Sequence, residues 1–370
     1  MPRSNPTGMS GNNVSLLLKF NHWVMHIPLW LYSLGLVLVV GVKSGITFTP
    51  LGLDELINFP APPNSWSAMS YGMRTAVFLS GNEGDIAFGV MGSFIVLLSF
   101  GFLTYAASRV MDRLISRLFL ALVIVGPIGM VLLNHIGRND VFVILGATVV
   151  AMYGQKIYMM VFGLVIMILG NPEQALVAFF CLVILSFIPV LNHWRRVAVS
   201  GFVIALAIFI PLSLYVRSSG VKGRLEILPE FLSASFYPFA ANLPLTLYAS
   251  FGAIWLIIGW VFLHISVKSR VLLVIGILVI PLFVTMITVD QTRVTVGVTT
   301  LSVMVILREF LPRIVSQLKS LNFAPILGTG VAIVLFLPVI EIWGTSGHTR
   351  TPYLWIFTSI VPQVKSLLIG

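Results

Sequence analysis

Long apolar runs separated by short polar breaks constrain this chain more than any other feature. Eleven such runs lie at 23–42, 86–107, 118–134, 141–154, 157–170, 174–191, 197–216, 244–263, 271–288, 294–307 and 324–341. A helix needs about 20 apolar residues to cross the hydrocarbon core of a bilayer. Only 9% of the residues are charged, against about 25% in a soluble domain. The pattern predicts an all-α polytopic membrane protein with about 11 transmembrane helices, in a range of 10 to 12.

The charged residues sort by side once the N-terminus is placed in the cytoplasm. Thirteen of the 22 Lys and Arg residues then fall in inner loops, and such a basic excess determines orientation. Acidic residues contribute little to orientation, so their own excess outside indicates a second cause. We interpret it as an active site on the extracytoplasmic side of the inner or plasma membrane. The ten outer acidic residues are Asp54, Glu55, Glu83, Asp85, Asp140, Glu173, Glu226, Glu230, Asp290 and Glu341.

No outer stretch is long enough to bury a core of its own, so residues 1–370 are expected to form a single transmembrane domain. The two long extracytoplasmic loops are expected at 43–85 and 217–243. Within the first, residues 66–79 have the spacing of a short helix that lies on the membrane, and residues 227–239 form an apolar stretch suited to the outer interface.

The net charge of +10 does not predict a nucleic-acid partner, because Lys and Arg beside membrane spans anchor them to anionic lipid. No Asp, Glu, Lys or Arg lies at the centre of a predicted span. Ion-coupled transporters usually carry such groups near the membrane midplane. These features favour membrane lipid as a partner and disfavour ion-coupled transport.

An acidic pair stands in the first long outer loop. Asp54 and Glu55 follow the first span within a proline-rich stretch. A carboxylate just outside the bilayer can act as a general base toward a hydroxyl group. The alternative is a solvated acidic pair with no chemical role.

A short outer turn at 135–140 combines four polar side chain types. His135, Arg138, Asn139 and Asp140 supply an imidazole, a guanidinium, an amide and a carboxylate. A cap on the following helix would explain Asp140, but it would not explain the other three. The turn is therefore a candidate site.

A third outer turn and two neighbouring segments supply further candidates. Arg293 at the outer start of a helix is well suited to a phosphate, although an ion pair with Asp290 that closes the turn is an alternative. Glu173 lies in a helix first turn, where the helix dipole alone would stabilise an acid. Arg217 and Arg224 in the second long loop suit an anionic lipid headgroup or plain solvation.

The residues 137–140, Gly-Arg-Asn-Asp, resemble the Gly-His-Asn-Asp signature of the GT-C superfamily. These are polytopic glycosyltransferases that use polyprenyl-phosphate sugars. The pair Asp54 and Glu55 looks like the acidic motif that this superfamily places in its first outer loop, and the turn 290–293 is similar to an outer-loop phosphate contact. Arg138 stands where the family has His, and no C-terminal soluble domain follows.

The resemblance implies transfer of a sugar from a polyprenyl-phosphate donor, undecaprenyl in a bacterium, to an extracytoplasmic glycan or a lipid-linked acceptor. It implies that Asp54 or Glu55 is the base and that Arg138 or Arg293 stabilises the phosphate leaving group. Asp140 would orient the acceptor or help to hold a divalent metal; the metal stays open, and no other cofactor is expected. We place His135 and Asn139 beside the donor phosphate, and Asp290, Glu173, Arg217 and Arg224 near the acceptor or behind the residues that touch it.

Two other functions stay open. A polysaccharide polymerase of the envelope would share the donor and the outer site, and the basic second loop favours it, whereas the acids of the first loop favour the single-sugar transferase. A lipid-linked sugar flippase or other transporter would need polar groups along a path through the bilayer. The predicted spans offer only scattered Ser, Thr, Asn and Gly residues.

Overall fold

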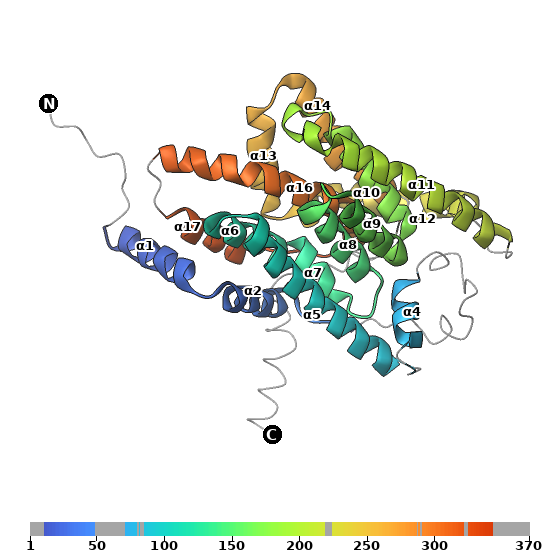
Figure 1. Ribbon diagram of the computed structural model, residues 1–370, viewed down its shortest axis with the longest axis horizontal. Coiled ribbons are helices and arrows are strands. Elements are labelled where there is room, and N and C mark those ends of the chain that lie inside the picture. The colour runs from blue at the N-terminus through green and yellow to red at the C-terminus, as the bar shows by residue number, and fades with distance from the viewer. Residues whose placement is uncertain are drawn as a thin grey trace.

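A computed structural model describes residues 11–48, 71–79, 81, 85–218, 224–286, 288, 291–321 and 325–342. Helices dominate this part of the chain, and no β-strand occurs within it. Figure 1 shows the helices packed into one elongated bundle. The first half comprises α1 (Gly11–His26), α2 (Leu29–Ser44), α4 (Gly72–Leu79), α5 (Asp85–Val110), α6 (Arg113–Ile124), α7 (Pro127–Asn134), α8 (Asp140–Tyr153), α9 (Ile157–Gly170) and α10 (Pro172–Leu185). The second half comprises η1 (Pro189–Trp194), α11 (Arg195–Ser218), α12 (Arg224–Phe251), α13 (Ile254–His264), α14 (Val267–Val274), η2 (Ile275–Val279), α15 (Ile280–Met286), α16 (Gln291–Ser320) and α17 (Ile326–Phe336).

Four helical segments among the described residues are long and apolar enough to cross a membrane, and the number rises to seven if each of three bent helix pairs counts as one span. These helices fit a multi-pass membrane protein. Each of the eleven predicted runs coincides with one of these segments or with one of four shorter apolar helices, which are α8, α9, α10 and α17. Because a helix rises about 1.5 Å per residue, the 14 residues of α9 span roughly 21 Å, less than a hydrocarbon core of about 30 Å. The number of crossings and the orientation therefore stay predictions.

The bends between the paired helices fall at proline or glycine. Pro28 separates α1 from α2, which meet at 115°, and Pro127 begins α7, which is bent by 50° from α6. Gly252 lies between α12 and α13, which meet at 92°, and its φ of +50° is a left-handed conformation that favours glycine. Proline cannot continue the backbone hydrogen bonds of a preceding helix. The sequence itself therefore specifies where these helices turn.

The two regions that were expected to lie in outer loops contain helices. The predicted helix at 66–79 corresponds in its described part to α4, whose Met73 and Val77 are fully buried. Residues 224–243 of the second region belong to α12. The spacing of Met73 and Val77 therefore predicted a helix, and these two side chains pack inside the protein.

Helix α16 passes through the middle of the bundle beside α8 and α10 (Figure 1), and every residue from 294 to 307 is buried. Asp140 at the start of α8 contacts Arg293 at the start of α16, and the end of α8 contacts Arg308. The two helices therefore run in the same direction. We call the end of the bundle with residues 134–140 the His135 end, and the opposite end, with Trp194 and Arg308, the Trp194 end.

Two buried cationic side chains donate hydrogen bonds to carbonyls at helix C-termini where a proline cannot do so. Lys43, with no exposed surface, donates from Nζ to the carbonyl of Val334 at 2.7 Å. The helical partner of that carbonyl would be residue 338, a proline without an N–H group. Arg117 donates from Nε to the carbonyl of Val24 at 3.0 Å, whose helical partner would likewise be a proline, Pro28. A cation at a helix C-terminus also interacts favourably with the helix dipole.

The Trp194 end contains a third capping cation. Arg308 donates from Nη1 to the carbonyl of Ala151 at 2.6 Å, in the last turn of α8. The neighbouring Glu309 accepts hydrogen bonds from Nε1 of the buried Trp194 at 3.1 Å and lies 3.3 Å from Nε2 of His193. Part of the large basic excess of this chain thus stabilises helix ends.

Candidate functional site

Backbone contacts fix the turn that was predicted as a site. The amide of Arg138 donates to the carbonyl of His135 at 3.0 Å. Gly137 between them has φ +96°, which an L side chain rarely adopts. A Cβ atom on Gly92 of α5 would lie 2.4 Å from the amide nitrogen of Gly137. Helix α5 therefore packs directly on the turn, and both glycines are needed where they stand.

Asn139 ties this turn to α4. The residue is buried at the N-cap position of α8, and its Oδ1 accepts a hydrogen bond from the amide of Met73 at 2.8 Å. The side chain makes no capping hydrogen bond to α8. The amide oxygen of Asn139 thus positions the short helix α4, which lies within the region 43–85 that was predicted as the first long loop.

Asp140 and Arg293 form an ion pair. Oδ2 of Asp140 lies 3.5 Å from Nη1 of Arg293, with 9% of the Asp140 side chain and 24% of the Arg293 side chain exposed. The pair joins the first turns of α8 and α16 across 153 positions of sequence. The alternative partner of Arg293, Asp290, lies outside the described residues. The pair leaves a partly exposed guanidinium group at the start of two helices.

Glu341 receives two side chains from the predicted turn. Its Oε1 lies 2.7 Å from Nε2 of His135, and its Oε2 accepts from Nδ2 of Asn134 at 3.2 Å. Exposure is low, at 10% for the His135 side chain and 7% for that of Glu341. An imidazole and a carboxylate are thus held together near the His135 end.

The segment after α17 joins these groups into one network. The amide of Ile342 donates to Oγ1 of Thr292 at 2.8 Å, and the amide of Thr292 donates to the carbonyl of Ile342 at 3.4 Å. Thr292 precedes Arg293, and Ile342 follows Glu341. Residues 134–140, 291–293 and 341–342, which we call the His135 network, therefore meet at one place.

No family matches this chain. Neither a curated protein nor a solved structure matches it either. The assignment of a role to the His135 network therefore depends on its own chemistry.

An aromatic group and a cation lie in the segment that Asn139 holds. The guanidinium of Arg74 is fully buried and lies 5.6 Å from the ring centre of Tyr71. Burial raises the pKa of the Tyr71 phenol, the Arg74 charge lowers it in part, and Tyr215 at the end of α11 raises it again. The phenol of Tyr71 is therefore neutral at physiological pH, and its polar interactions are hydrogen bonds.

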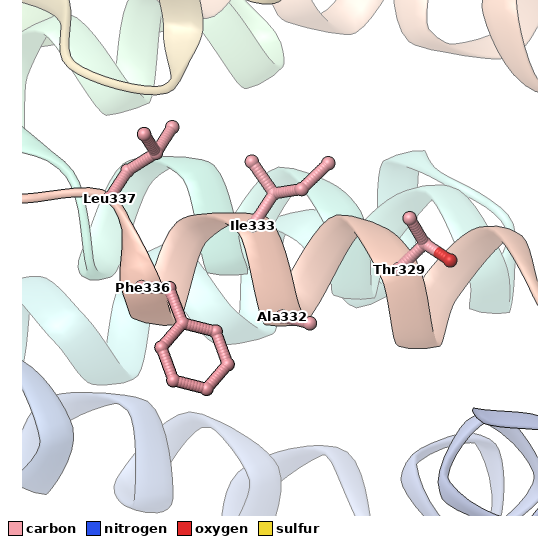
Figure 2. Close-up of a pocket in the computed structure, with 5 residues that line it drawn as sticks. All are labelled: Thr329, Ala332, Ile333, Phe336 and Leu337. Carbon is pink, nitrogen blue, oxygen red and sulfur yellow. The ribbon is translucent and has the colours of Figure 1, made fainter. Parts of the chain in front are cut away.

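An open apolar groove of about 460 Å³ runs along α17 (Figure 2). Ile333 and Leu337 point to one side of the helix and Phe336 to the other, and Phe336 is 84% exposed. Thr329 is the polar residue of the lining, which Ala332 completes. The groove offers a surface for hydrocarbon, and none of the five described residues that line it can act as an acid or a base.

The predicted site residues have different outcomes. The structure brings His135, Asn139, Asp140 and Arg293 to one end of the bundle, and Arg138 lies half-buried in the same turn. Glu173 lies in the first turn of α10 at this end, and Arg217 is exposed on the last turn of α11. Asp54 and Glu55 lie outside the described residues, as do Asp290 and the side chain of Arg224. Within the described part of the chain, no three His, Cys, Asp or Glu side chains lie close enough to hold a metal ion.

Sequence reasoning gave no role to three members of the network. Glu341 is one of the ten acidic residues predicted to lie outside, but nothing in the sequence assigns it to the site. Asn134 ends an apolar helix, and Thr292 is one of several threonines in α16. Nothing local in the sequence distinguishes these two residues, because tertiary contacts define their roles.

Proposed function

We propose that this protein is a membrane glycosyltransferase that moves a sugar from a polyprenyl-phosphate donor to an extracytoplasmic glycan or lipid-linked acceptor. The observation that carries the proposal is the convergence of His135, Asp140, Arg293 and Glu341 from three distant segments at one end of an apolar bundle. Ionisable groups in a membrane protein are costly, and their collection at one place is typical of a functional site.

The electrostatics of the His135 end support an anionic substrate. Helices α8, α10 and α16 all begin there, and the dipoles of helix N-termini attract anions. Arg293 adds a guanidinium that can bind a phosphate through two hydrogen bonds. In this proposal Arg293 contacts the donor phosphate, with Arg138 in the adjoining turn, and both stabilise the charge that develops as the phosphate leaves.

The groove along α17 supports a lipid substrate. Its lining is apolar, and its last residue, Leu337, lies four positions before Glu341. A hydrocarbon chain in this groove would have its end close to the segment that enters the His135 network. The charge distribution of the loops supports an extracytoplasmic position for this end.

The polar residues inside α16 favour an enzyme over a flippase. The hydroxyl groups of Thr295, Thr299 and Thr300 donate to carbonyls of their own helix at 2.8, 2.7 and 2.6 Å. Such bonds satisfy the hydroxyl groups locally. Between Arg293 and Arg308, α16 contains no charged residue. These threonines therefore do not supply the open polar path that a sugar would need.

A transfer assay tests the proposal. The purified protein receives a radiolabelled polyprenyl-phosphate hexose and a crude envelope acceptor, and transfer of label is measured. We expect transfer by the wild type, a fall in kcat/KM of about 10²- to 10³-fold for Arg293→Met, and a smaller fall for Arg293→Lys, which keeps the charge. Arg313→Met changes an exposed arginine of the same helix at the Trp194 end and should retain wild-type activity.

Two results would contradict the proposal. Absence of transfer from any donor, together with intact binding of a lipid-linked glycan, would indicate a flippase. Products of many repeat units built from two lipid-linked glycans would indicate a polymerase. Equal losses in Arg293→Met and Arg313→Met would remove the assignment of Arg293 to the phosphate.

A further inference from the structure

The contact between His135 and Glu341 is not used by the phosphate-binding role proposed above. We propose that His135, oriented by Glu341, is the general base that takes the proton of the acceptor hydroxyl group. The inference rests on the proposed function and identifies the base within it. It departs from the assignment of Asp54 or Glu55 that the superfamily resemblance implies.

The geometry leaves one of the two nitrogens of the imidazole ring for proton transfer. Nε2 of His135 lies 2.7 Å from Oε1 of Glu341, so in the neutral ring Nε2 carries the hydrogen and donates it to the carboxylate. The lone pair then lies on Nδ1, which forms no hydrogen bond with any residue that the structure describes. A carboxylate on one ring nitrogen selects the tautomer and leaves the other nitrogen as the base.

Glu341 is itself held in place. Asn134 donates to its second carboxylate oxygen at 3.2 Å, and Ile342, the next residue, is bonded through its amide to Thr292 at 2.8 Å. The carboxylate therefore cannot turn away from His135 without breaking its hydrogen bond to Asn134 of α7, and the backbone that carries it is fixed to α16. This rigidity keeps the imidazole ring in one orientation.

The other titratable groups of the His135 network are poorer candidates. Arg138 and Arg293 remain protonated in proteins. Asp140 is engaged in an ion pair with the guanidinium of Arg293. Glu341 is engaged by both Asn134 and His135. Of the described groups in this network, His135 is therefore the one whose second ring nitrogen stays available to an acceptor hydroxyl group.

The step balances without a further reactant. The acceptor oxygen forms a bond to the anomeric carbon as its O–H proton passes to Nδ1 of His135. The bond from the anomeric carbon to the phosphate oxygen breaks, and its electron pair leaves with the polyprenyl phosphate. The Glu341 carboxylate stabilises the imidazolium that results, which then releases its proton to water.

The pH dependence of kcat/KM tests the assignment. We expect the wild-type rate to fall at acidic pH as the imidazole is protonated. His135→Gln should lower kcat/KM by about 10²- to 10⁴-fold. It should also abolish the fall in kcat/KM at acidic pH, which we call the acidic limb. Glu341→Gln should also lower kcat/KM, by up to about 10⁴-fold, because a neutral amide no longer stabilises the imidazolium that forms in the reaction.

A matched histidine serves as the control. His193 lies 3.3 Å from Glu309 in a longer and more exposed histidine–glutamate pair at the Trp194 end, so His193→Gln should retain both the rate and its pH dependence. Free imidazole should restore part of the activity of His135→Gly. A purely structural role for His135 predicts no such rescue.

The outcomes separate this inference from the proposed function. If the wild type transfers no sugar, the proposed function fails, and the inference fails with it. If the wild type is active but His135→Gln keeps the acidic limb, or if Asp54→Asn or Glu55→Gln removes it, the inference alone is overturned. If His135→Gln does not fold, Glu341→Gln decides, and an unchanged kcat/KM in that variant overturns the assignment.

Discussion

Lys43→Met tests whether a buried cation stabilises the end of α17. The substitution keeps most of the length of the side chain and removes the ammonium group. In the wild type that group donates to the carbonyl of Val334 at 2.7 Å and has no exposed surface. Because Pro338 has no N–H group to replace it, the carbonyl is left buried and unsatisfied in the variant.

The expected loss is about 2 kcal/mol of unfolding free energy. A buried acceptor left without a donor costs about 1–3 kcal/mol, and loss of a cation at a helix C-terminus costs about 0.3–1 kcal/mol. Relief from burying the ammonium group of Lys43 offsets part of this sum. For a chain of 370 residues, a loss of this size corresponds to a fall in the unfolding midpoint of roughly 3 °C.

The single cysteine of the chain supplies the assay. Cys181 is fully buried in α10, so a thiol-reactive fluorophore labels it only as the protein unfolds. The midpoint of labelling on heating is compared for the wild type and Lys43→Met in the same detergent. An unchanged or higher midpoint for Lys43→Met would refute the reasoning, because it would show that burial of the charge costs more than the hydrogen bond contributes.

Two further substitutions have clear expectations in the same assay. Gly92→Ala should lower the unfolding free energy by about 1–3 kcal/mol, because its Cβ would lie 2.4 Å from the Gly137 amide nitrogen. A Cβ at Gly101 on the same helix meets nothing within 4 Å, so Gly101→Ala should be neutral or stabilising. Equal effects of the two substitutions would contradict the close approach of α5 to the turn. Arg308→Met should lower the unfolding free energy by about 2 kcal/mol, because the carbonyl of Ala151 at the end of α8 loses its donor. Arg313 is exposed, so Arg313→Met should have little effect. An unchanged unfolding free energy for Arg308→Met would show that this cap contributes nothing to stability.

Apolar length predicted where the helical segments lie, and proline positions explain two bends that were not predicted. The eleven runs coincide with helical segments, and Pro28 and Pro127 mark two of the bends. Residues 217–243 were expected to form a loop, yet α12 begins at Arg224 and continues to Phe251. Composition alone cannot exclude a helix in a moderately polar stretch, because packing against α15 and α16 decides whether one forms.

The candidate site could be predicted in its members but not in its pairings. The outer turn 135–140 and Arg293 were identified because polar side chains at the edge of apolar spans stand out. The pair of His135 with Glu341 joins residues 206 positions apart, and helical periodicity contains no information about such contacts. The alternative of an ion pair between Asp290 and Arg293 stays untested because Asp290 lies outside the described residues, whereas the contact of Arg293 with Asp140, 153 positions away, had no signal in the sequence.

The short length of α9 has a consequence for the surrounding membrane. Ile157, Tyr158 and Phe162 are exposed on this helix, so its side faces lipid. If α9 crosses the bilayer, its 14 residues fall about 9 Å short of an ordinary hydrocarbon core. This hydrophobic mismatch would thin the lipid beside α9 at a cost of fractions of a kcal/mol per Å and would favour thinner membranes. Lipid headgroups in such a depression would approach the His135 end from within the plane of the bilayer.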